Sequence, residues 1–399
     1  MKSMTSATTG MRRPSCLRGT GALFAVVLML GVTVACSSDS KTTASSTGSS
    51  STSATGSSAA DPVSAAKDRL QTFLAAPSKI RVSTPLTRKP DTGKKVFWLE
   101  GNAAQIQEFT PGFKDGAAAL GWNLTTLTYD VTDPQAVGAA MQQAIDQNAD
   151  FIVVSGQPEA LYSQQLASAK AKGIPVFDQS SANKPDPTGN GRFTNVAGPE
   201  STAEWLNAVA DYTIVDSGGK ANVLFANLAD FPVSQEAGAI MLDHFKSSCP
   251  GCTVTTINVP TSDLVAGNVP SLVVSAAQQH PGLQYVITMG GAIALGIQPA
   301  LAAANFNDVQ ICGLAPEKDQ VQDLVNGVKG AWAMFQTPMM SLVNIDAMAR
   351  LSVGMPIEQS EHDQIPFQIW DSDNVPKPAQ AFASPADALD QFKTIWKVK

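Results

Sequence analysis

The sequence predicts an α/β protein with two doubly wound lobes, because three observations agree. Apolar runs rich in β-branched residues alternate with helical patterns over most of the chain, which is typical of parallel sheets covered by helices. The alternation restarts after the polar loop Ser217–Lys220, so it occurs twice. Hydrophobic residues make up 44% of the 399 residues and charged ones 15%, which suffices for two domains with large cores.

The clearest unit lies in residues 149–179. The apolar run Phe151–Val154 predicts a buried strand, Glu159–Ala171 has helical spacing, and Ile174–Phe177 is a second apolar strand. Strand, helix and strand form a βαβ unit, whose two strands should be parallel. Ligands of such sheets lie beyond the carboxyl ends of the strands. The candidate site residues that we expect directly after these two strands are Gln157, Asp178 and Gln179.

The remaining elements follow from the same patterns, beginning with an amphipathic helix at Asp61–Ala76 and a proline-bearing connector at Pro77–Gly93. The other strands are predicted at Lys94–Leu99, Leu124–Tyr129, Phe193–Val196, Ala221–Ala226, Thr253–Val259, Tyr285–Thr288, Val309–Leu314, Gly330–Phe335 and Ile365–Trp370. The other helices are predicted at Gln105–Leu120, Pro134–Gln147, Glu200–Val215, Ser234–Lys246, Val269–Gln279, Ile293–Ala304, Gln320–Asn326 and Pro338–Ser352.

The first 36 residues have the layout of an export signal. A basic start precedes the apolar run Gly21–Ala35, which is shorter than the roughly 20 residues that a membrane span needs. Small residues then lead into Cys36, as in bacterial lipoprotein signals, where the cysteine is lipidated and becomes the new N-terminus. The alternative is a plain secretory peptide with an incidental cysteine.

Residues 37–60 consist almost entirely of Ser, Thr, Gly and Ala, which predicts a flexible tether. A signal, a cysteine and such a tether together predict a protein anchored by lipid to the extracytoplasmic face of the bacterial cell membrane. The net charge of −7 includes four basic residues of the leader, so the exported part is more acidic still. We therefore expect no nucleic-acid partner, which would need a clustered basic face.

Cys249 and Cys252 form the sequence CPGC between a predicted helix and a predicted strand. In an oxidising compartment this pair is most simply a local structural disulfide. A redox-active dithiol is the alternative, although such sites place the two cysteines at the opening of a helix. Cys312 lies inside an apolar strand and is expected to be a buried small hydrophobe.

Catalytic and metal-binding motifs are missing from the sequence. The three histidines have no metal-ligand spacing. No GxSxG or GxGxxG run and no phosphate loop occurs, and the acidic residues are scattered. We therefore expect neither an enzyme nor a cofactor or metal.

Several short motifs occur in an order that is typical of one family. They are Gly173-Ile174-Pro175-Val176, Gly218–Val223 and Ile293–Gly296, while Ala333–Pro338 is similar to a segment that crosses between lobes. With the lipoprotein start and the two lobes, they resemble the type I periplasmic solute-binding proteins of ABC importers, in the sugar-binding branch that includes ribose-binding protein. The resemblance covers roughly Lys94 to Trp370. It implies two Rossmann-like lobes joined by a three-strand hinge.

The resemblance also implies site residues. The family lines its cleft after the first strand, which corresponds here to Asn102 and Gln105, and Gln336 stands where it has a sugar-ligating glutamine. Charged ligand-binding residues of the family are replaced in this sequence. Gln235 occupies the position of an arginine, and Gly290-Gly291 occupies that of an Asn-Asp pair. The full candidate set is Asn102, Gln105, Gln157, Asp178, Gln179, Phe231, Gln235, Gly290, Gly291, Glu317 and Gln336.

Each candidate also has a structural interpretation. Gln157 and Gln179 could solvate loops, and Asp178 could cap a turn. Phe231 could stack on a ligand ring or close the edge of a lobe. The Gly290-Gly291 pair could meet the needs of a turn or leave room for a bulkier ligand.

The predicted division of the chain has five parts. A signal peptide (1–35), a lipidated cysteine with its tether (36–60), and a helix with its connector (61–93) precede the lobes. Residues 94–198 and 338–362 should form the first lobe, and residues 199–337 and 363–399 the second.

The expected function is that of a monomeric substrate-binding lipoprotein. It would close its lobes on a small polar solute, with a sugar or polyol favoured, and deliver it to a membrane permease. One alternative is a sensory lipoprotein that reports to a membrane receptor, and another is a binding protein for a less hydroxylated ligand.

Overall fold

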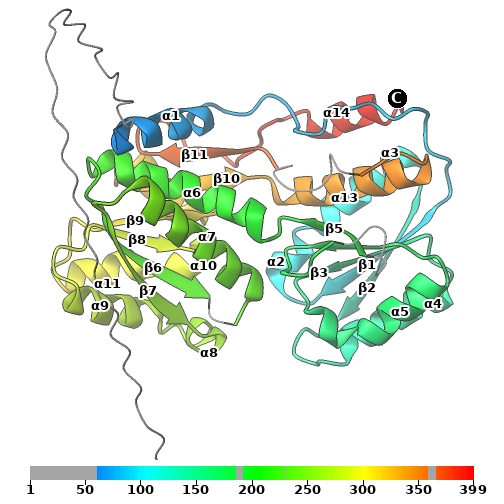
Figure 1. Ribbon diagram of the computed structural model, residues 1–399, viewed down its shortest axis with the longest axis horizontal. Helices are drawn as coiled ribbons and strands as arrows, with labels where there is room; N and C mark the ends of the chain where they lie inside the picture. The colour runs from blue at the N-terminus through cyan, green and yellow to red at the C-terminus, as the bar shows by residue number, and fades with distance from the viewer. Residues whose placement is uncertain (1–60, 186–191, 229, 358–364) are drawn as a thin grey trace, which may run out of the picture. The chain divides into compact units, whose positions relative to one another are not determined.

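The computed structural model describes residues 61–185, 192–228, 230–357 and 365–399, which belong to one compact unit (Figure 1). The predicted signal peptide, Cys36 and the tether lie outside the described residues. None of the helices within the described ranges is long and apolar enough to span a membrane.

The first sheet is parallel throughout, with the strand order β2-β1-β3-β4-β5. Its strands are β1 (Lys95–Gly101), β2 (Asn123–Tyr129), β3 (Phe151–Ser155), β4 (Val176–Gln179) and β5 (Arg192–Val196). The predicted βαβ unit is present as β3, α5 (Ser163–Ala171) and β4, because β3 and β4 pair in parallel.

The second sheet has the order β11-β10-β9-β8-β6-β7 and is parallel except for the pair β10–β11. Its strands are β6 (Asn222–Leu228), β7 (Thr253–Val259), β8 (Tyr285–Thr288), β9 (Gln310–Leu314), β10 (Ala331–Phe335) and β11 (Phe367–Asp371). Two mostly parallel sheets with helical connections confirm the predicted fold class.

The helices occupy the connections between the strands and both ends of the described chain. The helices up to β6 are α1 (Pro62–Leu74), α2 (Ala104–Gln107), α3 (Thr110–Leu120), α4 (Ala136–Asp146), the 3-10 turn Glu159–Leu161, α5 and α6 (Pro199–Asp216). Those after β6 are α7 (Pro232–Ser248), α8 (Thr261–Val265), α9 (Val269–Gln279), α10 (Gly291–Ala294), α11 (Ile297–Ala303), α12 (Lys318–Val325), α13 (Thr337–Ser352) and α14 (Ala388–Ile395).

Two predicted helices are interrupted in the structure. The pattern at 105–120 is divided into α2 and α3 just before Pro111, which opens α3. The pattern at 293–304 is divided into α10 and α11 at Gly296, whose φ of 77° lies in the left-handed region that glycine adopts readily. The helix predicted to begin at Ser234 begins two residues earlier, at Pro232, directly after Phe231.

The apolar core has three clusters. One covers a face of the first sheet against α4 and α5, and a second covers a face of the second sheet against α9, α11 and α12. The third and largest includes side chains from both sheets, from α1, α6 and α13, and from the C-terminal Trp396. The opposite faces of the two sheets therefore share one continuous core.

The chain crosses between the two lobes three times, and the third crossing leads into β11. It leaves the first sheet from β5 into α6, which packs on β9, β10 and β11, and it leaves β10 into α13, which packs on α3 and β5. It then returns to the second sheet at β11. The final helix α14 contacts α13 and α3, with Trp396 Nε1 donating to Asp346 Oδ1 at 2.8 Å, so the end of the chain lies against first-lobe helices.

Candidate functional site

Each sheet has one point where its strand order reverses. In the first sheet this point lies between β1 and β3, and in the second it lies between β6 and β8. Connections leave such neighbouring strands in opposite directions and create the crevice in which ligands of open α/β sheets bind. The residues just past these four strands, which we call strand exits, include Asn102, Gln157, Phe231 and Gly290. Sequence reasoning had selected all four.

Asp178 and Gln179 lie inside β4 and not after it, because the strand runs to Gln179. Asp178 is fully buried and accepts hydrogen bonds through Oδ2 from Ser181 Oγ at 2.9 Å and Asn183 Nδ2 at 2.6 Å. The Tyr162 hydroxyl donates to the same oxygen at 3.3 Å, and the Gln179 amide donates to Oδ1 at 2.9 Å. Asp178 therefore joins β4 to the loop that follows it.

The side chain of Gln179 points to α13. Its Oε1 accepts from Asn344 Nδ2 at 2.8 Å, and Asn344 Oδ1 accepts from Thr194 Oγ1 at 2.7 Å. All three residues are fully buried. Gln179 Nε2 is buried without a hydrogen-bond partner among the described residues, so it has donors left for a water or a ligand atom.

Asn102 is exposed at the exit of β1 and holds the neighbouring exit in place. Its Nδ2 donates to Asp130 Oδ1 at 3.4 Å and its Oδ1 accepts from the Val131 amide at 3.1 Å. Hydrogen bonds from the backbone and side chain of Thr132 lower the pKa of Asp130. Gln105 is exposed in α2, one turn further along.

Gln157 lies half-buried at the exit of β3, where its carbonyl accepts from Asn183 Nδ2 at 2.8 Å. Tyr129, the last residue of β2, is a neighbour that sequence reasoning missed. Burial, followed by the charge of Asp178, raises the pKa of the Tyr129 phenol, so this group remains a neutral hydroxyl. An apolar strand ending in tyrosine was the available signal.

Glu100 is a second residue that sequence reasoning did not select. It lies near the end of β1 with only 9% exposure, and its carboxylate accepts hydrogen bonds from Thr110 and from Thr128 Oγ1, the latter at 3.0 Å. Thr110 Oγ1 in turn accepts from Trp98 Nε1 at 2.9 Å. This chain of bonds joins β1, β2 and the start of α3 behind the exit of β1.

Phe231 is the exposed aromatic of the second lobe, with 40% of its surface accessible. It occupies the N-cap position of α7, directly after the exit of β6. Gln235, one turn into α7, is exposed, and its Nε2 donates to the Leu228 carbonyl at 3.2 Å. Phe231 therefore presents an apolar face, while the amide of Gln235 is partly used to fix the loop.

The two glycines after β8 have different surroundings. A Cβ atom on Gly291 would lie 2.5 Å from the Glu317 amide nitrogen and 2.7 Å from the Ala315 carbonyl oxygen, so this position requires glycine. A Cβ atom on Gly290 would meet nothing nearer than 4.0 Å. Gly291 therefore satisfies close backbone packing, and Gly290 leaves open space.

Glu317 caps α12. Its side chain accepts from the amide of Gln320, and Gln320 Oε1 accepts from the Glu317 amide at 2.5 Å, which together make a capping box. Gln320 Nε2 also donates to the Gly291 carbonyl at 3.2 Å. Gln320, oriented by Glu317, thus joins the start of α12 to the loop after β8.

Gln336 lies at the end of β10, where the chain crosses to α13. Its Nε2 donates to the Pro385 carbonyl at 3.0 Å, and the residue is half-buried. Phe335, just before it, stacks on Trp205 of α6 with ring centroids 4.1 Å apart. The two crossings β5–α6 and β10–α13 therefore meet through an aromatic pair.

Charged groups at the exits are largely occupied by their own loops. Asp130 and Asp178 accept the bonds described above, and Asp230 Oδ2 accepts from the Thr261 amide at 2.7 Å, a bond that lowers the pKa of Asp230. No group of three or more His, Cys, Asp or Glu side chains suited to a metal ion occurs within the described ranges. The exits thus offer mainly neutral amide, hydroxyl and aromatic groups.

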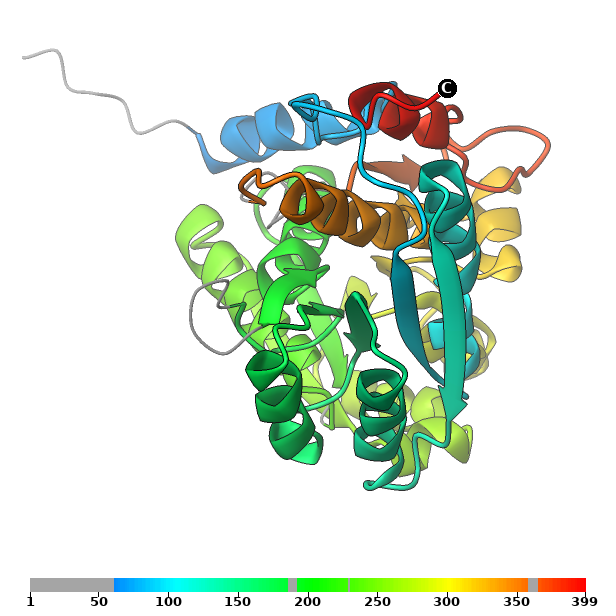
Figure 2. The same ribbon diagram turned by 90° about the vertical axis from the view of Figure 1, so that its right-hand side faces the viewer.

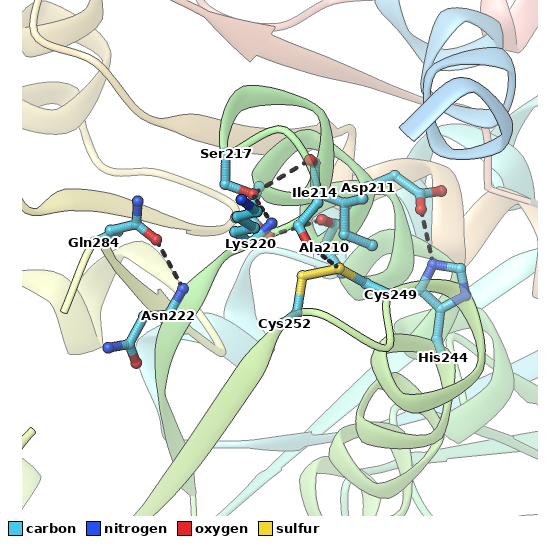
Figure 3. Close-up of a disulfide and its surroundings, with 12 residues drawn as sticks. Ala210, Asp211, Ile214, Ser217, Lys220, Asn222, His244, Cys249, Cys252 and Gln284 are labelled. Carbon is cyan, nitrogen blue, oxygen red and sulfur yellow. Dashed lines mark hydrogen bonds and ion pairs between the residues drawn. A yellow bond between two sulfur atoms is a disulfide. The ribbon is translucent and has the colours of Figure 1, made fainter. Parts of the chain in front are cut away.

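Cys249 and Cys252 form a disulfide that joins the end of α7 to the start of β7 (Figure 3). Two hollows lie elsewhere on the second lobe. One of about 480 Å³ lies between α1, α6 and α7, and one of about 170 Å³ lies beside α10, α11 and α12. Cys312 is buried and free, and burial raises the pKa of its thiol to about 12.

Comparison with known proteins agrees with this architecture. Residues 96–356 match the family described as periplasmic binding protein domain. A search of curated protein sequences gives no match. Solved structures with the same fold include a periplasmic ribose ABC transporter protein from Conexibacter woesei, with 19% identity and a TM-score of 0.60 over 71% of this chain and 94% of that one.

Two further solved structures have similar values. The 5-methylthioribose transporter solute-binding protein of Thermotoga lettingae, in complex with 5-methylthioribose, has 16% identity and a TM-score of 0.58 over 73% of this chain and 89% of that one. An ABC transporter solute-binding protein of Mycobacterium smegmatis with bound glycerol has 19% identity and a TM-score of 0.57 over 71% and 96%. The family match covers more than half of the chain, and the fold agrees with it. The chain therefore belongs to the periplasmic binding protein domain family and has the two-lobed fold of the solute-binding proteins of sugar ABC transporters.

Proposed function

We propose that this protein is the extracytoplasmic substrate-binding component of an ABC importer. It binds a small polar solute between its lobes and closes about the three chain crossings. The main support for this proposal is that both sheets place neutral polar and aromatic residues at the points where their strand order reverses. The protein acts by binding and not by catalysis.

The favoured ligand is a sugar or a polyol. The similar structures with bound 5-methylthioribose, D-allose and glycerol support this choice. Asn102, Gln157 and Gln336 provide amides that suit neutral hydroxyl groups. Gln235 and Gly290 stand where the family has charged or amide side chains that bind sugar hydroxyl groups. A ligand with fewer hydroxyl groups is therefore the second candidate.

The remaining parts of the proposal concern location and partners. We propose that the protein is a monomer held at the membrane by lipid on Cys36, and that it delivers its ligand to a permease. A sensory lipoprotein that reports to a membrane receptor is the alternative. Loss of radiolabelled palmitate incorporation in a Cys36→Ser variant, against a labelled wild type, would support the anchor. An unlabelled wild type would refute it.

A thermal-shift screen tests the ligand class. The panel should contain pentoses, hexoses, glycerol and other polyols, deoxy and thio sugars, amino acids and aromatic acids. A ligand present at 100 times its Kd stabilises the folded protein by about 2.7 kcal/mol, so a true ligand gives a shift of several degrees. Stabilisation by sugars or polyols supports the proposal, and stabilisation by another class alone refutes the sugar assignment.

Two substitutions test the location of the site. Phe231→Ala and Gln336→Ala should each raise the Kd of the best ligand about tenfold, since each removes a stacking or hydrogen-bonding group. The matched control is Val265→Ala, because Val265 is 83% exposed and is the last residue of α8, outside the candidate set. Equal affinity of all three variants in calorimetry would refute the assignment.

A further inference from the structure

Two segments of the described chain lie outside the range that matches the family, and they pack on each other. The first runs from 62 to 95 and the second from 365 to the C-terminus. Figure 2 shows the blue helix α1 and the red helix α14 along the same side of the molecule. We call α1, the connector 75–88 and α14 the clasp.

The N-terminal part of the clasp is attached to the second lobe. Arg69 makes a bidentate pair with Asp211 of α6 at 2.8 and 2.6 Å, and Asp211 is 3% exposed. His244 of α7 also lies 2.9 Å from Asp211, as Figure 3 shows. Phe73 stacks on Phe367 of β11 with centroids 4.3 Å apart. This part of the clasp thus contacts α6, α7 and β11 of the second lobe.

The next residues keep this attachment. Gln368 Nε2 of β11 donates to the Leu74 carbonyl at 2.8 Å. Arg81 NH1 donates to Glu204 of α6 at 2.7 Å, and its guanidinium lies 5.6 Å from the centroid of the Phe367 ring. Just before Arg81, Gln391 of α14 accepts a hydrogen bond from the Ile80 amide at 3.1 Å and donates to the Ser78 carbonyl at 3.0 Å.

The following residues are attached to first-lobe helices. Arg350 of α13, which is 1% exposed, donates from NH2 to the Thr84 carbonyl at 2.7 Å and pairs with Asp346 at 2.6 Å. The Leu86 amide donates to the Ile395 carbonyl of α14 at 2.8 Å. Because α14 packs on α13 and α3, the connector and α14 are held on the first lobe together.

The link between the two attachments is short. Arg81 holds α6, whereas Thr84 is held by α13 and Ile80 by Gln391 of α14, so the two attachments lie within three residues of Arg81. The three residue steps from Arg81 to Thr84 can span at most about 10 Å along the backbone. Val82 is buried and Ser83 is exposed. A movement that separated α6 from α13 near this link would have to break one attachment.

We propose that the clasp restricts the movement of the two lobes and thereby sets the affinity for the ligand. This inference depends on the proposed function. A ligand that needs a particular lobe arrangement binds more weakly when that arrangement is a smaller fraction of the ligand-free population. The clasp reduces the range of lobe arrangements that the ligand-free protein samples. Ligand binding therefore costs less conformational entropy.

Lengthening the link is the sharpest test, because it leaves the Arg81 and Arg350 anchors in place. The variant has Gly-Ser-Gly-Ser inserted after Ser83, and it and its control both carry Gln391→Ala, because Gln391 otherwise holds Ser78 and Ile80 to α14. The matched control has the same insertion after Gly267, a left-handed residue in the turn between α8 and α9 with nothing within 4 Å of its Cβ position. Arg81→Gln is the second variant, which removes the hold on Glu204 without inserting residues.

The readouts are the Kd of the best ligand from the thermal-shift panel and the distance between the lobes without ligand. Pulsed EPR measures this distance between spin labels on Gln143→Cys in α4 and Val265→Cys in α8, in a Cys36→Ser background. We expect the insertion after Ser83 to raise the Kd about three- to tenfold and to broaden the distance distribution. Arg81→Gln should act in the same direction, and the Gly267 insertion should change neither.

Either an unchanged Kd or an unchanged distance distribution in both clasp variants would overturn the inference. A tighter Kd would overturn it too. The failure of the proposed function has a different signature, in which no compound stabilises the wild type. In that case the broadening of the ligand-free distances still tests whether the clasp restricts the lobes.

Discussion

The strand exits of the two lobes are built differently. In the first lobe they are joined by hydrogen bonds through buried polar side chains, such as Asp178 with Asn183 and Glu100 with Thr128. In the second lobe the exits have close backbone packing at Gly291, open space at Gly290 and an exposed ring at Phe231. The first lobe therefore has a polar wall of fixed geometry, whereas the second has free space and an apolar surface.

Under the proposed function, this difference divides the recognition of the ligand between the two lobes. Preorganised polar groups bind hydroxyl groups at low cost in entropy, because their rotamers are already fixed. An open, apolar exit selects a ligand by shape and by stacking. Differences in ligand among members of this fold can thus arise in the second lobe while the first keeps its geometry.

Breaking the polar wall should have the largest effect. Asp178→Ala removes the acceptor of several buried donors, including Tyr162 and Ser181, so the free energy of unfolding should fall by about 3 kcal/mol. Urea unfolding measures this loss. Asp130→Ala is the control, because Asp130 is exposed and its replacement should cost much less stability. Similar losses of unfolding free energy in the two variants would show that the buried hydrogen bonds of Asp178 do not stabilise this lobe.

The two glycines test the second lobe. Gly291→Ala should cost about 1–3 kcal/mol of stability, because its Cβ would overlap the backbone near Glu317. Gly290→Ala should leave the stability unchanged, since its Cβ meets nothing within ordinary contact. If Gly290→Ala weakens ligand binding in calorimetry at full stability, the open space is part of the site. Equal melting temperatures of the two variants would contradict the described packing.

The disulfide should contribute a moderate stability that is specific to the second lobe. Replacing Cys249 and Cys252 by serine opens a very short loop, for which the chain-entropy account gives about 2 kcal/mol or less. Hydrogen exchange should show faster opening of the α7–β7 region, while β1 to β4 are unaffected. The same pattern should appear on reduction of the wild type. Faster exchange in the first sheet as well would show that the lobes do not unfold separately.

The smallest expected effect concerns Asp323 of α12. Burial, followed by the charge of Asp319, raises the pKa of Asp323 above its ordinary value of 3.8. Its protonated form is therefore favoured in the folded protein, and this contribution to stability is lost as the pH rises through the folded-state pKa. Asp323→Asn should raise the stability at pH 7 by less than about 0.5 kcal/mol and have no such effect below pH of about 3. A stability gain that is equal at both pH values would contradict this explanation.

Much of the fold could be predicted from the sequence, because strand and helix periods are local properties. The strands at 124–129, 253–259 and 285–288 lie where apolar patterns placed them, to within a residue. Helix breaks were missed, since the helical pattern continues across Gly296 while its backbone does not. The position of α14 could not be predicted, because it depends on contacts with α13 and α3, which are distant in the sequence.

The candidate site was predictable only in part. The sequence located the exits of β1, β3, β6 and β8, but it placed Asp178 and Gln179 outside β4, where they are buried strand residues. Glu100 was missed, because its partners Thr110 and Thr128 lie on other elements, and Tyr129 was missed because its burial beside Asp178 depends on the tertiary fold. The orientation of a side chain depends on its strand register, which is a tertiary property.

The contact between Leu86 and Ile395, near the two ends of the described chain, has a consequence for biogenesis. The helix layer over the first sheet includes the bond from Trp396 to Asp346, so the first lobe cannot be completed before residue 396 has been synthesised. Contacts that are so remote in sequence slow folding, because a long loop must close before they form. The first lobe of a nascent chain thus stays unfinished long after all five strands of its sheet have been made.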